Sequence, residues 1–208
     1  MAISAAHPFL IGIAGPSGSG KTALARRLAP LLPRDSIVIS LDSYYHPQSH
    51  LPAEQRAALN YDHPDALDWH LLLAHLDRLR HGHAVEQPIY RFDHHTRDAV
   101  TRRVPPRPFL VLEGILALYS PKVRDIMDLK VFVDTREEEC FGRRLRRDVA
   151  ERGRTEASVA EQYQATVRPM AEQYVLPSRR FADLIVSGEE PIDAGVDRVL
   201  AAVRGQRV

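Results

Sequence analysis

Five short runs of apolar residues recur along the chain, and each has the length of a buried strand. They cover residues 9–14, 37–41, 109–112, 129–133 and 184–186, and a polar or glycine-containing turn follows each one. Their apolar residues are nearly continuous and do not alternate with polar ones, which is typical of strands in a parallel sheet. We therefore expect these five runs to form a buried sheet.

Between these runs the spacing of apolar residues changes to the period of a helix. In residues 66–80 the apolar side chains fall on one face, and Gly82 follows as a stop signal. The expected helices cover residues 21–28, 66–80, 137–151 and 192–203. Because strands that alternate with helices pair in parallel, the pattern predicts an α/β fold with a five-stranded parallel sheet flanked by helices.

A smaller pair of strands is expected outside the main sheet. Residues 83–92 and 99–104 have strand-like composition, and a proline-rich stretch directly after them stops regular pairing. Residues 83–104 would then form a small β-hairpin insertion. No internal repeat and no linker-like stretch divides the sequence, so we expect residues 1–208 to form a single domain.

Charge and cysteine content narrow the classes of function. The 28 Lys and Arg residues nearly balance the 27 Asp and Glu residues, which gives a formal charge of +1, so nothing calls for a nucleic-acid partner. Cys140 is the single cysteine and cannot form an internal disulfide. No basic region precedes the apolar run at residues 9–13, and no run is long enough to cross a bilayer. We expect a cytoplasmic protein without a membrane partner.

The stretch GIAGPSGSGKTALARR, residues 12–27, joins the first expected strand to the first expected helix. It has the spacing of a phosphate loop, with a glycine, four further residues and then Gly-Lys-Thr. In such a loop backbone N–H groups surround phosphate oxygens, the lysine reaches the outer phosphates, and the threonine hydroxyl can bind magnesium. The residues expected to hold a nucleoside triphosphate are Gly15, Ser17, Gly18, Ser19, Gly20, Lys21 and Thr22.

Two carboxylates end later strands at the same edge of the sheet. Asp42 follows IVISL, and Glu113 ends FLVLE. Asp42 can take a proton from an attacking hydroxyl group or hold magnesium through water, and Glu113 is better suited to the metal side. The alternatives are a capping or turn Asp and an ordinary acid at a strand end. With Lys21 and Thr22, these carboxylates make a set suited to phosphoryl transfer.

The stretch RRLRRDVAERGR is rich in arginine. Arginines brought over a transferred phosphoryl group would balance its growing negative charge and exclude water. Helical spacing predicts Arg143, Arg147 and Arg154 roughly along one side, with Arg144 further round. The alternative is a solvated helix whose arginines pair with acids of the same segment, such as Asp148.

Several further motifs carry a resemblance to a known family. LDSYYH, NYDHPDALD, PIYRFDHHTR, LEGILAL, VFVDT, RRLRRDVAERGR and VRPMAEQYVLPS follow the phosphate loop in that order. In order and spacing the chain closely resembles the uridine-cytidine kinase family from about residue 9 to residue 186. The resemblance implies a P-loop kinase fold with an arginine-rich lid at about residues 143–160 and the hairpin on the substrate side. It also implies phosphorylation of uridine or cytidine at the 5′-hydroxyl group, with ATP or GTP as donor and Mg²⁺ as cofactor.

The resemblance gives roles to residues near the phosphates. Lys21, Arg147 and Arg152 match residues that contact the triphosphate, and Asp42 matches the base for the 5′-hydroxyl group. The residues that match the metal side are Thr22, Asp42 and Glu113.

It also gives roles to residues on the nucleoside side. Asp62 matches the acid that binds the ribose hydroxyls, with Arg144 and Gln162 at partner positions. A carboxylate that accepts from two vicinal hydroxyls would prefer ribose to deoxyribose. Tyr90 and His95 match the residues that read the pyrimidine edge. The further expected substrate contacts are Tyr45, Tyr61, Phe92 and Arg154.

Two positions depart from the family pattern. Residues 187–190 read SGEE where relatives usually have a proline, a basic residue and glycines near the donor purine. The preference for ATP or GTP as phosphate donor therefore stays open. Arg91, beside Tyr90, stands where relatives often carry Asp or a small polar residue. The preference for uridine or cytidine as substrate therefore stays open. The resemblance further implies homotetramers and feedback inhibition by CTP or UTP.

Other functions fit the sequence less well. A GTPase-like switch needs an NKxD-type guanine-binding motif, yet Asn60 is the only asparagine and Tyr61 follows it. A related kinase that acts on another metabolite with a hydroxyl group, such as pantothenate or ribulose phosphate, is a further alternative. A pyrimidine pocket with Tyr90 and His95 argues against it. The near-neutral charge disfavours an arginine-rich RNA-binding module.

Overall fold

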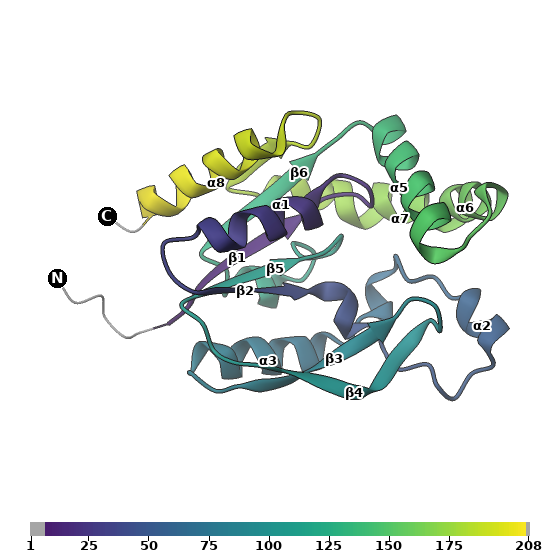
Figure 1. Ribbon diagram of the computed structural model, residues 1–208, viewed down its shortest axis with the longest axis horizontal. Helices are drawn as coiled ribbons and strands as arrows, with labels where there is room; N and C mark the ends of the chain where they lie inside the picture. The colour runs from purple at the N-terminus through teal and green to yellow at the C-terminus, as the bar shows by residue number, and fades with distance from the viewer. Residues whose placement is uncertain (1–6, 207–208) are drawn as a thin grey trace.

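A five-stranded parallel sheet runs through the centre of the computed structural model, which describes residues 7–206 (Figure 1). Neighbouring strands pair in the order β2-β5-β1-β6-β7. The strands are β1 (Phe9–Ala14), β2 (Ser36–Ser40), β5 (Phe109–Glu113), β6 (Leu129–Asp134) and β7 (Leu184–Ser187). The predicted α/β fold with its five-stranded parallel sheet is confirmed, and every strand lies within one residue of its predicted bounds.

The two faces of the sheet bury separate apolar clusters, because successive side chains of a strand point to opposite sides. From β1, Leu10 packs in one cluster, and Ile11 and Ile13 pack in the other. Helices α1 (Lys21–Leu28) and α8 (Ile192–Gln206), purple and yellow in Figure 1, cover the face of Ile11. Helix α3 (Trp69–Arg80) covers the opposite face. Because helices cover both faces of the sheet, successive side chains of a strand are all buried, which explains the continuous apolar runs in the sequence.

The expected hairpin is present, but its second strand is longer than predicted. Strand β3 (Val85–Arg91) pairs antiparallel with β4 (Thr96–Val104), beside α3 and away from the main sheet (Figure 1). Residues 96–98 are polar and only half-buried, so the apolar pattern did not include them. Their pairing with β3 nevertheless continues to the tip, where Arg91 lies opposite Thr96.

The remaining helices are short, apart from α5, which stands with α6 beyond the end of the sheet in Figure 1. They are α2 (Ala53–Ala57), α4 (Pro121–Arg124), α5 (Glu137–Arg152), α6 (Glu156–Gln162) and α7 (Arg168–Met170). Short 3₁₀ segments occupy residues 29–31, 41–44, 64–66 and 176–181, and π-helical turns occupy 163–167 and 171–175. Of these, the sequence pattern predicted only α5.

Two local boundaries differ from the prediction for identifiable reasons. Helix α3 begins at Trp69 and not at Ala66, because the Asp68 carboxylate caps it by accepting the N–H of Leu71 at 3.0 Å. Asp42 lies in a 3₁₀ turn directly after β2.

The predicted absence of a basic N-terminal region concerns residues 1–6, which lie outside the described residues. Within residues 7–206, no helix has both the length and the apolar character to cross a membrane.

Candidate active site

The loop of residues 15–20 passes close to α5. Gly18 has φ +87°, and a Cβ atom there would lie 2.2 Å from the carbonyl oxygen of Cys140. A side chain is therefore excluded by both the backbone conformation and the neighbouring helix. Gly20, at φ +97°, precedes α1, so the N–H groups of the first turn of α1 open towards the loop. This geometry suits an anion such as phosphate.

Four charged or polar side chains meet directly behind the loop. The Thr22 hydroxyl donates to Glu113 Oε2 at 2.9 Å, and Lys21 Nζ donates to the carbonyl oxygen of Pro16 at 3.4 Å. Burial lowers the pKa of Lys21, although Glu113 and Asp42 oppose this shift. Burial also raises the pKa of Glu113, with Lys21 opposing. The lysine is thus a desolvated cation that lacks full compensation, which favours an anionic ligand.

The oxygen atoms of Thr22, Asp42 and Glu113 fit magnesium, a hard cation that takes hydroxyl, carboxylate, phosphate and water ligands. Across residues 7–206, no three His, Cys, Asp or Glu side chains are grouped so that they could hold a metal by themselves. Magnesium is commonly held by one or two carboxylates together with substrate phosphates and water. The residues therefore fit a magnesium ion that binds with a nucleotide.

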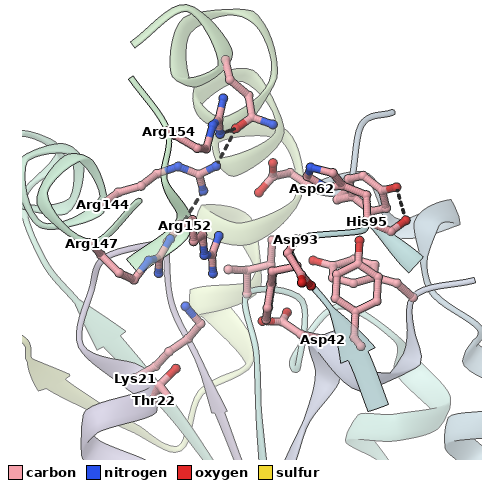
Figure 2. Close-up of a pocket in the computed structure, with 17 residues that line it drawn as sticks. Lys21, Thr22, Asp42, Asp62, Asp93, His95, Arg144, Arg147, Arg152 and Arg154 are labelled. Carbon is pink, nitrogen blue, oxygen red and sulfur yellow. Dashed lines mark hydrogen bonds between the residues drawn. The ribbon is translucent and has the colours of Figure 1, made fainter. Parts of the chain in front are cut away.

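A cleft leads from the phosphate loop to the hairpin (Figure 2). In Figure 2, Lys21 and Thr22 lie at one end, His95 lies at the other, and the labelled arginines lie above Lys21 and Thr22. The predicted residues that line it are Ser17, Lys21, Thr22, Asp42, Tyr45, Tyr61, Asp62, Tyr90, Phe92, His95, Arg144, Arg147, Arg152, Arg154 and Gln162. The predicted residues outside its lining are Gly15, Gly18, Ser19, Gly20 and Glu113.

Aromatic rings form the wall of the hairpin end. The ring centroid of Tyr45 lies 5.3 Å from that of Tyr61 and 5.1 Å from that of Tyr90, and Tyr90 lies 5.1 Å from Phe92. The ring of His95 stacks on Tyr61 at 5.8 Å. Such a wall can hold a flat heteroaromatic ring.

His95 has an unusual backbone and a shifted pKa. It has φ +49°, and its carbonyl oxygen lies 3.0 Å from the Tyr61 hydroxyl group, which can donate to it. Burial, reinforced by the positive charges of Arg154 and Arg152, lowers the pKa of the His95 ring. The imidazole is therefore neutral at neutral pH and offers one donor and one acceptor.

Between the two ends, Arg144 connects the phosphate loop to α6. It donates to Ser17 Oγ at 2.9 Å and to Gln162 Oε1 at 3.0 Å, and Arg154 donates to the same oxygen. Asp62 lines the cleft and is buried, and this burial raises its carboxyl pKa, with Arg144 as the main opposing charge. Keeping Asp62 ionised in the folded protein therefore costs free energy, and a ligand that donates hydrogen bonds to it would reduce this cost.

The arginines do not divide as the helical spacing predicted. Arg147 and Arg152 line the cleft, and the Arg152 guanidinium carbon lies 4.2 Å from the centre of the Phe92 ring. Arg144, predicted to lie further round, also lines the cleft, whereas Arg143 points elsewhere and donates to the carbonyl oxygen of Gly188 at 2.9 Å. The prediction that Arg143, Arg147 and Arg154 share one side is wrong. Arg143 and Arg147 are four residues apart on α5, but their side chains turn to different partners, Gly188 and Asp148. Arg154 lies beyond the end of α5, past the turn at Gly153, where helical spacing no longer applies.

A second cavity lies on the other side of the phosphate loop. Its lining includes Ser19, Gly20, Arg143, Gly188 and Glu190. Residues 187–190 therefore rest on the loop itself: a Cβ atom at position 188 would lie 2.2 Å from the carbonyl oxygen of Ser19.

Three residues at the cleft were not predicted as site residues. Asp93 and Ile115 line it, and Asp148 lies fully buried behind the arginines. Asp93 and Ile115 stand inside the motifs PIYRFDHHTR and LEGILAL, which gave a signal for both. Arg91, by contrast, turns to Asp93 and Asp98, with closest contacts of 2.9 and 3.4 Å, and is not part of the cleft lining.

Comparisons with known proteins decide the family. A profile of the "Phosphoribulokinase / Uridine kinase family" matches residues 10–191. The chain belongs to this family. Among its relatives, a uridine kinase of Chloroflexus aggregans is 48% identical over 198 residues, covering 95% of each chain. A uridine kinase of Shewanella amazonensis is 51% identical over 182 residues, covering 85% of this chain and 86% of the relative.

Solved structures agree on the fold of this kinase. Phosphoribulokinase from Rhodobacter spheroides matches with a TM-score of 0.63 at 17% identity, covering 90% of this chain and 74% of that one. D-glycerate 3-kinase from Cryptococcus neoformans matches with a TM-score of 0.61 at 17% identity, covering 89% and 88%. At such identities the likeness shows a shared kinase fold and does not bear on the substrate.

Proposed function

We propose that this kinase transfers the terminal phosphoryl group of ATP or GTP to the 5′-hydroxyl group of uridine or cytidine. The observation that carries the proposal is the continuous cleft, with Lys21 and Thr22 at one end, the aromatic wall around Tyr90 and His95 at the other, and Asp42 in the same lining. The uridine kinases that share about half of its residues support the choice of substrate.

In this mechanism the nucleoside enters at the hairpin end. Asp62 accepts hydrogen bonds from the two ribose hydroxyls, and Tyr90 and His95 bind the edge of the base. The Asp42 carboxylate takes the proton of the 5′-hydroxyl group while that oxygen forms a bond to the terminal phosphorus. The bond from this phosphorus to the bridging oxygen breaks, and the nucleoside diphosphate leaves.

The cationic residues act on the charge that develops during transfer. Lys21, Arg147 and Arg152 would stabilise the phosphoryl oxygens, and the arginines would exclude water from the reaction. Thr22, Asp42 and Glu113 would hold magnesium, which when bound neutralises phosphate charge. The donor purine would occupy the second cavity beside residues 187–190.

The experiment is a coupled phosphotransfer assay with ATP or GTP and magnesium, offered uridine, cytidine, 2′-deoxyuridine, adenosine and pantothenate. We expect product from uridine and cytidine, and much less from 2′-deoxyuridine because Asp62 then loses a donor. Triphosphate binding without turnover of either pyrimidine ribonucleoside would contradict the proposed substrate, and turnover of pantothenate would favour a sister kinase.

Asp42→Asn tests the base. Loss of a general base should lower kcat by roughly 10²–10⁴-fold, while uridine KM changes little. Asp35→Asn is the matched control, since Asp35 precedes β2, as Asp42 follows it, and is exposed. Equal kcat for Asp42→Asn and wild type would refute the role of Asp42.

The finer consequences of the family resemblance stay predictions. These are a place in pyrimidine salvage in the cytoplasm, a homotetramer, a lid at about residues 143–160, and inhibition by CTP or UTP. Light scattering coupled to size-exclusion chromatography tests the tetramer, and the assay above with added CTP or UTP tests the inhibition.

A further inference from the structure

A single buried carboxylate joins the arginines of the cleft. Asp148, on α5, has no exposed surface. Its Oδ1 lies 2.8 Å from Arg147 Nη2 and 3.4 Å from Arg152 Nη1. Its Oδ2 lies 3.4 Å from Arg144 Nε and 4.0 Å from Arg154 Nη1. One acid therefore lies within 4.0 Å of a guanidinium nitrogen of all four arginines of the cleft lining, hydrogen-bonded to Arg147 and at ion-pair distance from the other three.

The contacts of Asp148 determine orientation as well as charge. Arg147 approaches Oδ1 with both Nη2 and Nε, at 2.8 and 2.9 Å, which fixes the plane of its guanidinium group. The backbone carbonyl of Asp148 also accepts the N–H groups of Gly153 and Arg154, the latter at 3.2 Å. The turn that returns Arg154 to the cleft is thus anchored on the same residue.

The charge balance around Asp148 leaves a positive excess. Four guanidinium groups crowded together repel one another, and one carboxylate neutralises only part of their charge. Burying this carboxylate is costly unless its partners stay in place. The remaining positive charge faces the cleft, where Arg152 also packs on Phe92. The cluster therefore suits a polyanionic ligand.

We propose that Asp148 is a positioning residue for phosphoryl transfer. Its carboxylate holds Arg147 and Arg152 over the phosphates and Arg144 and Arg154 beside the nucleoside, without touching either substrate. This inference rests on the proposed function. It assigns to Asp148 the geometry of the arginines, on which stabilisation of the transferred group depends.

The first test replaces Asp148 with Asn, which keeps the shape of the side chain and removes its charge. The freed arginines should separate, and we expect kcat for uridine to fall by roughly 10–100-fold, because misplacement by about 1 Å can cost this much. Glu151→Gln, an exposed change on the same helix, is the matched control and should keep wild-type kcat.

Two readouts separate positioning from loss of folded protein. Titration calorimetry with the non-hydrolysable analogue AMP-PNP and magnesium should give unchanged stoichiometry with a Kd raised by roughly 3–10-fold. In the Arg147→Ala background, Asp148→Asn should cost at least fivefold less in kcat than in wild type, since its closest partner is gone. Reduced stoichiometry with unchanged Kd, or additive losses in kcat, would overturn the proposal.

Asp148→Glu decides the matter if the Asn variant does not fold. It keeps the charge and moves the carboxylate by one methylene, so a folded Glu variant with wild-type kcat and Kd would overturn the proposal. If wild type does not phosphorylate uridine, the proposed function fails, but the AMP-PNP titrations still test Asp148.

Discussion

At the scale of single residues, the binding role proposed for Asp62 opposes its effect on stability. Burial raises its pKa above the ordinary value of 3.8, which means that its ionised form is held at a net cost in the folded protein. This cost is complete above the raised pKa and disappears below about 3.8, where the carboxyl group is protonated in both the folded and the unfolded state. A ribonucleoside that donates two hydrogen bonds would reduce the cost.

Replacement of Asp62 by Asn should therefore stabilise the free protein and impair the enzyme. At pH 7 we expect Tm to rise, and each 1 kcal/mol gained would raise Tm by roughly 2–4 °C in a chain of this size. The uridine KM should rise at least tenfold, because the amide accepts less well than a carboxylate. Calorimetric melting at several pH values checks the first expectation, and the gain in Tm should shrink as the pH falls towards 4.

Asp65→Asn provides the control for this change, since Asp65 is an exposed acid three residues further along. It should leave both Tm and uridine KM unchanged. A Tm for Asp62→Asn at or below that of wild type at pH 7 would mean that Arg144 compensates the buried carboxylate in full.

At the scale of elements, the phosphate loop is fitted against α5 through Gly18. Gly18→Ala should destabilise the protein by about 1–3 kcal/mol and weaken AMP-PNP binding, because a Cβ atom would collide with the carbonyl oxygen of Cys140. Gly82→Ala is a matched control: Gly82 has a similar φ of +80°, and nothing lies within 4 Å of the added atom. Urea unfolding of both variants measures the difference in their free energies of unfolding. Equal losses of stability would show that α5 can shift to make room for the added atom.

The sequence pattern could predict elements whose apolar residues follow a standard period. The strands are buried on both faces, so their apolar runs stand out, and α1 is bounded by Gly20 and Pro30. Residues 156–181 were missed because they form a series of short α-helical, π-helical and 3₁₀ pieces and not one regular helix, with Pro169 and Pro177 interrupting the pattern. Within this segment the buried Val159, Tyr163 and Val167 recur every four residues, a spacing that one face of a helix allows.

The candidate site shows the same limit. The place of Lys21 could be predicted from the spacing of the phosphate loop. Asp42 and Glu113 could be placed near it because each follows or ends a strand, and parallel strands bring these ends together. The nucleoside residues depended on a family resemblance. The pairing of Asp148 with arginines of its own segment was the alternative that the sequence offered. Its burial among four of them could not be predicted, since this depends on the return of the chain at Gly153, which brings Arg154 back to the cleft.

At the scale of the whole molecule, the two ends of the cleft have different origins. The phosphate end is built on the main sheet and α1, whereas the hairpin supplies Tyr90, Phe92 and His95 at the other end. Within the residues that the structure describes, the hairpin forms its own two-stranded sheet. The two ends should therefore respond separately to changes.

Replacing residues 92–95 with Asn-Gly tests this separation. Arg91 and Thr96 are paired across the tip, so a two-residue turn can close the hairpin. Without Phe92 and His95, we expect kcat/KM for uridine to fall by roughly a hundredfold or more, because the substrate is no longer oriented. AMP-PNP affinity, measured by calorimetry, should stay within about twofold of wild type, since Lys21 and Thr22 are untouched. A parallel loss of AMP-PNP binding would show that the ends form one unit.

The contact between Gly188 and the phosphate loop limits which substitutions near the loop are possible, both in evolution and in engineering. Arg143 holds the Gly188 carbonyl, and a side chain at position 188 would meet the Ser19 backbone, so this position has little freedom to vary. Glu189 is also held, because its carboxylate accepts from Arg136 N and Arg136 Nε, each at 2.8 Å, at the start of α5. Glu190 is exposed and constrained less. A library aimed at a different phosphate donor should therefore randomise residue 190 and keep Gly188 and Glu189, since a change at Gly188 would deform the phosphate loop.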